Sequence, residues 1–215
     1  TRLNNYRAEV VVVPEVKKLL GSLAELCGIE VEGYAPEQVD DLLERLPLEK
    51  PFVEGLRSMT RMTVSPNQIH GGSKTNIIPD YCEADLDIRI LPGQDRDYVI
   101  NELRKVIGDE LEIEFTEYRE PTFSSASEPF YKLMEEVTLE VAGKGSLCLP
   151  LISSGSTDSK FLRGFGIPAY GIGHMARGLD PTIRTTIHGK NERTHVASLQ
   201  LKTAFLKELA RRYLV

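Results

Sequence analysis

Apolar and polar positions alternate without interruption along residues 81–90. The apolar set is Cys82, Ala84, Leu86, Ile88 and Ile90, and the polar set is Tyr81, Glu83, Asp85, Asp87 and Arg89. Such strict period-two alternation is typical of a half-buried strand. Gly-Gly at residues 71–72 predicts a turn before it, and Pro-Gly at residues 92–93 ends it. We expect the apolar face to pack on a helix layer and the polar face to meet water or a ligand.

The rest of the first half shows mainly helical spacing of its apolar residues. The expected helices cover residues 15–27, 35–46, 52–58 and the stretch between Asp95 and Gly108. Asp95 suits an N-cap, and glycine at 108 suits a helix stop. Two further short strands are expected at residues 60–64 and 111–116. The order strand, strand, helix, strand indicates part of a ferredoxin-like α+β sandwich.

The pattern changes after residues 118–127, a stretch rich in serine that contains Pro121 and that we interpret as a linker. Helical spacing returns at residues 130–141 and again at residues 196–213. Between them lie two almost continuous apolar runs, 147–152 and 167–172, of the kind found in strands of a parallel sheet that is buried on both faces. This half therefore resembles a small piece of a doubly wound α/β domain.

Composition narrows the function classes. The 215 residues carry a net charge of −6, and no basic patch interleaved with aromatics appears, so nucleic acid is not an expected partner. No apolar run approaches the roughly 20 residues of a membrane helix, and no secretory signal pattern is visible. The three cysteines are far apart, which favours reduced thiols in a cytosolic protein over a thiolate metal site. A start at Thr1 rather than Met suggests a fragment.

Two polar loops could carry chemistry. The first, residues 153–158, follows a predicted buried strand and precedes a helix, a place where α/β sheets bind ligands. Helix capping by Ser156 or Asp158 is the alternative. The second contains His188 before a glycine, and a loop histidine of this kind is more often solvated than a metal ligand. Neither loop has the sequence of a phosphate loop or a nucleophile elbow.

A third candidate pairs Asn76, in the turn before the alternating strand, with Arg89 at the end of its polar face. A guanidinium and an amide are suited to binding a carboxylate. The simpler interpretation, which we favour from the residues alone, is an exposed ion pair between Arg89 and Asp87 or Asp85.

Together these stretches resemble a known family. GGSKTNIIPDYCEADLDIRILPG is similar to the lid-domain motif of the di-zinc metallopeptidases related to acetylornithine deacetylase, succinyl-diaminopimelate desuccinylase, carboxypeptidase G and aminoacylase-1. SGSTDSKFLRGFGIPAYGIG resembles the glycine-rich turn, Thr-Asp helix and Gly-Ile-Pro strand of that family, and IHGKNER resembles its closing His-Gly motif. The three motifs occur in the family's order and cover nearly the whole chain.

The resemblance implies the role of each residue. His188 matches a metal ligand, Asn76 and Arg89 match lid residues that bind the substrate carboxylate, and residues 155–157 (Gly155, Ser156, Thr157) match a turn that contacts substrate. It also implies two zinc ions, with cobalt or manganese as alternatives, and a homodimer formed by the lid. The implied reaction is hydrolysis of an amide bond beside a free carboxylate, in an N-acyl amino acid or a peptide, by a metal-activated water.

The chain also departs from the family. The His-x-Asp motif, the bridging Asp and the Glu-Glu pair of the catalytic half do not occur before Gly71, and the first lid strand is missing. We therefore expect residues 1–118 to be most of the lid, with the tail of a lid helix at residues 1–6. Residues 119–215 would then be the C-terminal part of the catalytic domain. No catalytic residue is expected in this stretch, and the chain alone should be inactive.

Two other function classes stay open. The chain could be a non-catalytic dimerisation module, which the upstream gene sequence would reveal. It could also be a serine hydrolase that uses Ser154 or Ser156 with His188, although the nucleophile elbow is absent.

Overall fold

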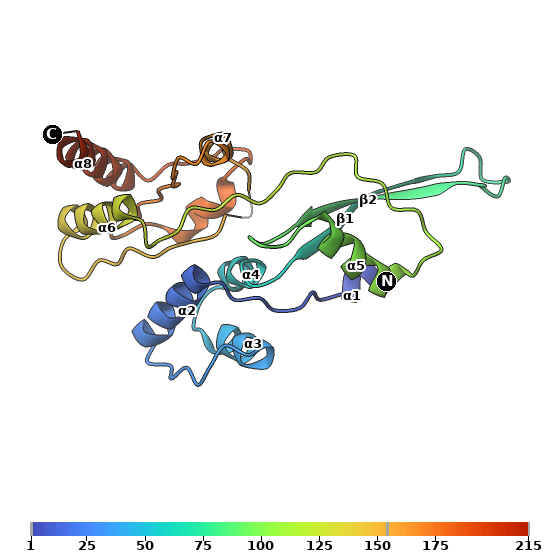
Figure 1. Cartoon of the computed structure of the whole chain (residues 1–215), viewed down its shortest axis with the longest axis horizontal. Coiled ribbons are helices and arrows are strands. Elements are labelled where there is room, and N and C mark those ends of the chain that lie inside the picture. Colours follow the sequence, from blue (N-terminus) through green and yellow to red (C-terminus); the bar gives the residue numbers. More distant parts are fainter. Residues whose placement is uncertain (1, 154, 215) are drawn as a thin grey trace. The chain divides into compact units, whose positions relative to one another are not determined.

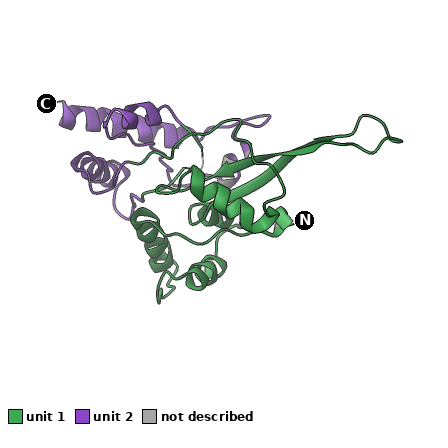
Figure 2. Cartoon of the chain, turned by 45° about the vertical axis from the view of Figure 1, so that its right-hand side comes forward, with its two compact units in different colours: residues 1–123, 150–156 green, residues 124–149, 157–215 purple. Residues whose placement is uncertain are grey.

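The computed structural model describes residues 2–153 and 155–214, and the chain forms two compact units. Unit 1 contains residues 1–123 and 150–156, and unit 2 contains residues 124–149 and 157–215 (Figure 2). Each unit mixes regular elements with long extended segments (Figure 1). The domain boundary at residues 118/119 stays a prediction.

Three helices in unit 1 follow the predicted spacing. They are α2 (Pro14–Leu26), α3 (Pro36–Arg45) and α4 (Lys50–Ser58), each with proline in its first turn, where a missing N–H costs nothing. Gly28 has φ of +66°, which suits a glycine directly after a helix end. Asp40 of α3 accepts hydrogen bonds from Arg57 of α4 and from the buried Arg61. Helices α3 and α4 are therefore held together by an ion pair as well as by apolar packing.

The alternating stretch forms the second strand of an antiparallel hairpin. Strand β1 (Thr63–Gly71) pairs with β2 (Cys82–Arg89), from Thr63 opposite Arg89 to Gly71 opposite Cys82. The prediction of a strand at residues 60–64 was wrong in its bounds, because β1 continues through Ser65-Pro66-Asn67 to Gly71. The register shifts between Pro66 and Gln68, and such a bulge in an edge strand tolerates a proline.

A helix layer covers only the base of this hairpin. Helix α5 (Arg96–Ile107) starts at Asp95, whose side chain accepts a hydrogen bond from the Tyr98 amide at 2.8 Å, and ends before Gly108. The short helix α1 (Arg2–Asn5) packs against α5 and β1. Its assignment as the tail of a lid helix stays a prediction. The core between them contains Ala8, Met62, Val99 and Leu103, flanked by Val64, Leu86, Ile88 and Ile90.

The distal half of the hairpin departs from the expected half-buried strand. Cys82 and Ala84 belong to the apolar face but are exposed, and Ile69 on β1 is 74% exposed. The hairpin extends beyond α5, and none of the described helices covers this part (Figure 1). Alternation therefore predicted the strand correctly but not the length over which one face is buried.

The strand predicted at residues 111–116 was wrong. Ile113 and Phe115 do pack on the core beside α5, and Arg96 lies over the Phe115 ring at 4.3 Å. The backbone, however, joins no ladder. In a ferredoxin-like sandwich the last strand pairs with the first strand rather than with the central hairpin, and the described residues hold no strand ahead of α1.

Unit 2 is built around two long helices. Helix α6 (Pro129–Ala142) and helix α8 (Val196–Tyr213) pack on each other, close to the predicted bounds. Their shared core contains Tyr131, Met134, Val137, Phe205 and Leu209. The short helix α7 (Ser159–Gly164) and the 3₁₀ helix η1 (Pro181–Thr186) lie between them in sequence.

The two strands predicted at residues 147–152 and 167–172 are not strands in the described chain. Neither segment has regular secondary structure, and neither joins a β-ladder. The second is held instead by side chains: the Ala169 amide donates to Ser124 Oγ at 3.1 Å, and the Tyr170 hydroxyl donates to the Ser125 carbonyl at 2.7 Å. A continuous apolar run indicates burial, but a parallel strand forms only where a partner strand is in place.

Candidate functional site

His188 lies in a strained turn directly after η1. Its φ is +60°, and Asn191, three residues later, has φ of +59°. These are the non-glycine residues of the described chain with positive φ, and backbone strain of this kind concentrates at functional sites. The His188 side chain is exposed. The turn therefore leaves this imidazole accessible to a ligand or a metal ion.

Hydrogen bonds to Thr186 close the turn that carries His188. The Gly189 amide donates to the Thr186 carbonyl at 3.0 Å, and the Arg193 amide donates to Thr186 Oγ1 at 3.2 Å. A side chain at position 189 would place its Cβ 3.2 Å from the Thr186 carbonyl oxygen, so the glycine allows this close approach. The sequence Thr-Ile-His-Gly thus fixes the histidine locally, without help from distant elements.

Asp180 anchors the other end of this loop. It caps η1 by accepting from the Thr182 amide at 2.9 Å and from the Thr182 hydroxyl at 2.7 Å. The Thr182 hydroxyl and amide lower the pKa of Asp180, and the Arg193 guanidinium at 3.8 Å adds to this. Asp180 is therefore a charged structural partner, and its carboxylate is already committed to the loop.

The described residues do not form a complete metal site. Among them, no group of three or more histidine, cysteine, aspartate or glutamate side chains could hold a metal ion. A catalytic zinc site takes about three protein ligands. His188 can offer one ligand, so a metal bound there would need the rest of its ligands from outside the described residues.

The predicted substrate turn is short and exposed. The Gly155 amide donates to Ser153 Oγ at 3.1 Å, and Gly155, Ser156 and Thr157 are all exposed. Ser154 lies outside the described residues. The alternative of simple capping at Asp158 finds no support, because the side chain of Asp158 makes no capping hydrogen bond to α7. The role of residues 155–157 in substrate binding stays a prediction.

The structure does not bring Asn76 and Arg89 together. Asn76 lies in the loop that closes the hairpin, whereas Arg89 lies at the base of β2, opposite Thr63. The length of β2 between them is about 23 Å at the rise of an extended strand. The Arg89 guanidinium instead binds Asp87 with two hydrogen bonds of 2.5 and 2.6 Å, which is the ion pair favoured from the residues alone.

The predicted site residues fall into both units. Asn76, Arg89, Gly155 and Ser156 belong to unit 1, and Thr157 and His188 belong to unit 2. Within unit 1 the length of the hairpin separates Asn76 from Arg89. Within unit 2 the turn after η1 carries His188 and no other predicted site residue.

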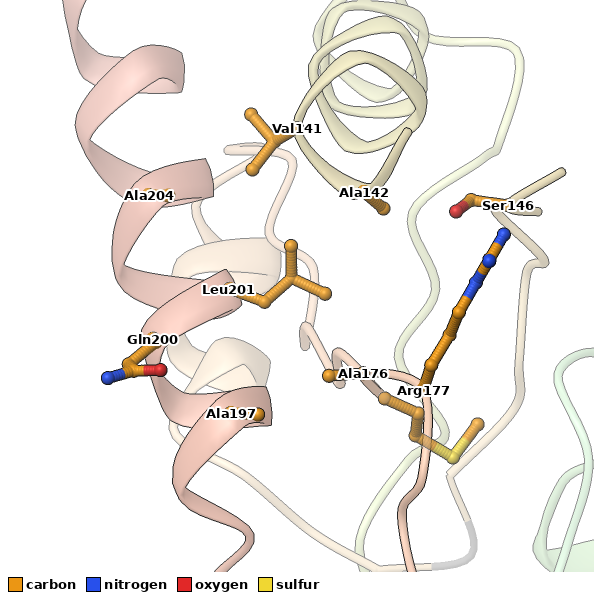
Figure 3. A pocket seen from close by; sticks show the side chains of 10 residues that line it. Val141, Ala142, Ser146, Ala176, Arg177, Ala197, Gln200, Leu201 and Ala204 are labelled. Carbon is orange, nitrogen blue, oxygen red and sulfur yellow. The ribbon is translucent and has the colours of Figure 1, made fainter. Parts of the chain in front are cut away.

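A pocket in unit 2 was missed by the sequence analysis. It lies between α8, the end of α6 and the loop at residues 175–177, and Arg177 stands at its edge (Figure 3). The signal that could have revealed it is the spacing of Ala197, Leu201 and Ala204, which places small and apolar side chains on one face of α8.

Comparison with known proteins identifies the chain's relatives. Residues 15–114, which include α2 to α5 and the hairpin, match the peptidase dimerisation domain of M20 peptidases. The chain is a relative of the M20 peptidases. It is 25% identical to human N-fatty-acyl-amino acid synthase/hydrolase PM20D1 over 175 residues, which is 80% of the chain and 33% of that protein. It is 27% identical to mouse aminoacylase-1 over 183 residues, or 78% of the chain and 40% of that protein.

A solved structure supports the fold. The M20 family metallo-carboxypeptidase Sso-CP2 from Sulfolobus solfataricus matches with a TM-score of 0.54 and 19% identity, over 94% of this chain and 45% of that one. The predicted class, an α+β lid followed by part of an α/β peptidase domain, is therefore confirmed, although three of the predicted strands form no ladder in the described residues. The chain spans between about a third and a half of the length of the relatives that it matches.

Proposed function

We propose that the whole protein hydrolyses an amide bond beside a free carboxylate, as an N-acyl amino acid deacylase, a metallo-carboxypeptidase or a dipeptidase. The observation that carries this proposal is the match of residues 15–114 to a peptidase dimerisation domain, together with relatives that are named aminoacylase and synthase/hydrolase. The structural similarity to a metallo-carboxypeptidase, which extends over 94% of the chain, is compatible with the same hydrolase class.

In this proposal the chain contributes binding groups rather than a complete reaction centre. His188 would be one ligand of a pair of zinc ions, presented by its strained turn. Asn76 and Arg89 would bind the substrate carboxylate, and Gly155, Ser156 and Thr157 would contact the substrate. Because β2 separates Asn76 from Arg89, each would act by its own contact rather than as a joint clamp.

We also propose that the hairpin forms a two-fold dimer with a second copy. Both edges of the two-stranded sheet lack a ladder partner among the described residues, and Ile69, at 74% exposure, lies on its distal half. Open strand edges favour pairing with another chain. Light scattering should show a dimer that Ile69→Lys weakens, and a monodisperse monomer at high concentration would contradict the interface.

The cytoplasm is the proposed location. Cys27, Cys82 and Cys148 form no disulfide in the described chain, which is compatible with a reducing compartment. In the described chain, no helix has the length and apolarity needed to cross a membrane.

The experiment compares this chain with the whole protein. Purified chain with added zinc should not hydrolyse N-acyl amino acids or dipeptides above background, and calorimetry should show no zinc site tighter than micromolar, because one imidazole is too few ligands. The whole protein should hydrolyse them and lose bound zinc and turnover in His188→Ala. His195→Ala is the matched control, since His195 bonds Ser198 at the start of α8.

Three outcomes would contradict the proposal. Hydrolysis by the chain alone that a chelator abolishes would show that the ligand set was misjudged. A whole protein without turnover on any of these substrates would favour a non-catalytic dimerisation module. Labelling of Ser156 by a fluorophosphonate probe would favour a serine hydrolase.

A further inference from the structure

Unit 2 contains an open pocket that none of the candidate site residues lines. Its volume is about 400 Å³, within the range of small-molecule sites. The wall consists mostly of apolar and small side chains: Val141, Ala142, Met175, Ala176, Ala197, Leu201 and Ala204. Ser146, Arg177 and Gln200 are the polar residues that line it.

The apolar wall comes from two helices. Ala197, Leu201 and Ala204 follow one another at helical spacing along α8, and Leu201 points into the space between α8 and the end of α6 (Figure 3). Val141 and Ala142 face them from the last turn of α6. Alanines make the space, because their short side chains leave room that a larger residue would fill.

Arg177 is fixed at the edge of this pocket from two sides. Its loop is tied to α8, because the Ala176 amide donates to Ser198 Oγ at 3.0 Å. Its guanidinium donates to the Lys144 carbonyl at 3.1 Å, just beyond the end of α6. The side chain runs toward Ser146 (Figure 3). Arg177 is itself exposed, and these two contacts direct its guanidinium to the edge of the pocket, where it can meet an anion.

The guanidinium retains unused binding capacity. Among the described residues Arg177 forms no ion pair with an acidic side chain, and one carbonyl uses only part of its five N–H donors. A cation beside an apolar cavity complements a ligand that has an anionic head and an apolar tail.

We propose that this pocket binds a monocarboxylate with a short linear apolar chain. The carboxylate would accept hydrogen bonds from Arg177, with the Ser146 hydroxyl beside it, and the hydrocarbon would lie on Leu201 and the alanines of α8. The volume suits a medium-length chain rather than a long lipid. This inference does not depend on the proposed hydrolase activity, because none of the residues assigned to that activity lines the pocket.

Alanine-methyl NMR on the full chain tests the site directly, because four alanines line it. The probe is octanoate, with 1-octanol as the ligand without a charge and acetate as the ligand without a tail. Octanoate should shift the methyl signals of Ala142, Ala176, Ala197 and Ala204 saturably. We expect 1-octanol and acetate to bind at least about tenfold more weakly, since each lacks one of the two contacts.

Variants distinguish binding at this pocket from nonspecific binding of the ligand to the protein surface. Arg177→Ala should weaken octanoate about tenfold and leave 1-octanol unchanged, whereas Arg177→Lys should recover part of the loss. Ala204→Leu keeps the cation and fills the cavity, so it should weaken octanoate as well. Arg211→Ala, which removes a guanidinium from the end of the same helix, is the control and should change nothing.

Three results would overturn the proposal. In the first, the four methyl signals do not respond to octanoate while the spectrum shows a folded chain. In the second, 1-octanol binds as well as octanoate. In the third, Arg211→Ala weakens binding as much as Arg177→Ala does. Because no turnover is measured, failure here leaves the proposed hydrolase function untouched, and failure of that function leaves this site untouched.

Discussion

The hairpin of unit 1 and the two apolar runs of the second half are built from equally good strand sequences, yet only the hairpin forms a ladder. Strands β1 and β2 are joined by one loop, so each supplies the other's partner. The runs at residues 147–152 and 167–172 have no such neighbour in the described chain. An antiparallel pair can close locally, whereas a parallel strand needs a partner brought by a long connection.

The same contrast extends to burial. Leu86 and Ile88 at the hairpin base are partly buried, and the core that they pack on belongs to unit 1. In the second half, Leu151 is 59% exposed, Phe165 is 84% exposed and Ile167 is 51% exposed. Helices and hairpins thus find their hydrogen-bond partners within a short stretch of sequence. The strands of an α/β sheet need partner strands from distant parts of the chain.

Cavities in the two cores give the largest effects and test whether the units are independent. Leu103→Ala, in the core of unit 1, should cost about 2–5 kcal/mol, and Phe205→Ala, fully buried in unit 2, about 3–5 kcal/mol. Amide hydrogen exchange should show the loss of protection confined to the mutated unit. If either variant lowered amide protection equally in both units, the two units would not be independent.

A buried polar contact of unit 1 should give the next effect. Glu102 on α5 is buried and accepts hydrogen bonds from Tyr6 and Lys105. Burial raises the pKa of Glu102, but these two partners outweigh it and lower the pKa overall. Tyr6→Phe should therefore cost about 1.5–3 kcal/mol in urea unfolding.

Tyr81→Phe is the matched control for that contact. The Tyr81 hydroxyl also donates to a carboxylate, Glu83, but on the exposed distal hairpin. Water replaces a hydrogen bond there, so we expect no measurable change in stability. Similar losses in the two variants would mean that burial does not distinguish the base of the hairpin from its distal half.

Arg89 should matter more for ligand binding than for folding. Its ion pair with Asp87 is about half exposed, so Arg89→Ala should change the free energy of unfolding by less than about 1 kcal/mol. In the whole protein the same change should weaken carboxylate substrates about tenfold or more, and their methyl esters far less. Equal effects on acid and ester would leave Arg89 as a structural partner of Asp87 only.

His174 of unit 2 should give the smallest effect, visible only in mild acid. Burial of the imidazole lowers the pKa of His174, and the nearby positive charge of Lys202 lowers it further. Below about pH 6.5 the unfolded chain then binds more protons than the folded chain, so stability falls as pH drops from 6.5 through the lowered pKa. Urea midpoints at pH 7.5 and 5.5 should differ less in His174→Gln than in the parent. Glu208, with a pKa of about 2, does not titrate in this window.

Local features were predictable because their causes lie close in sequence. Asp95 and Gly108 bound α5 as expected, and α8 covers residues 196–213 as its spacing predicts. An ion pair of Arg89 with Asp85 or Asp87 was also predictable from their positions on one face of a strand, and the structure shows Asp87 as the partner. The family resemblance rested on motifs such as Ile-His-Gly, and the comparisons confirm it.

The sequence by itself determined the helices, the alternating strand and the family. Only the tertiary structure decided that Pro66 sits within a strand, that Asn76 and Arg89 lie at opposite ends of β2, and that Arg177 borders a pocket. The physical reason is distance along the chain. Caps, turns and helical faces depend on residues within a few positions, whereas ladders, burial and cavities depend on segments that meet only in the folded molecule.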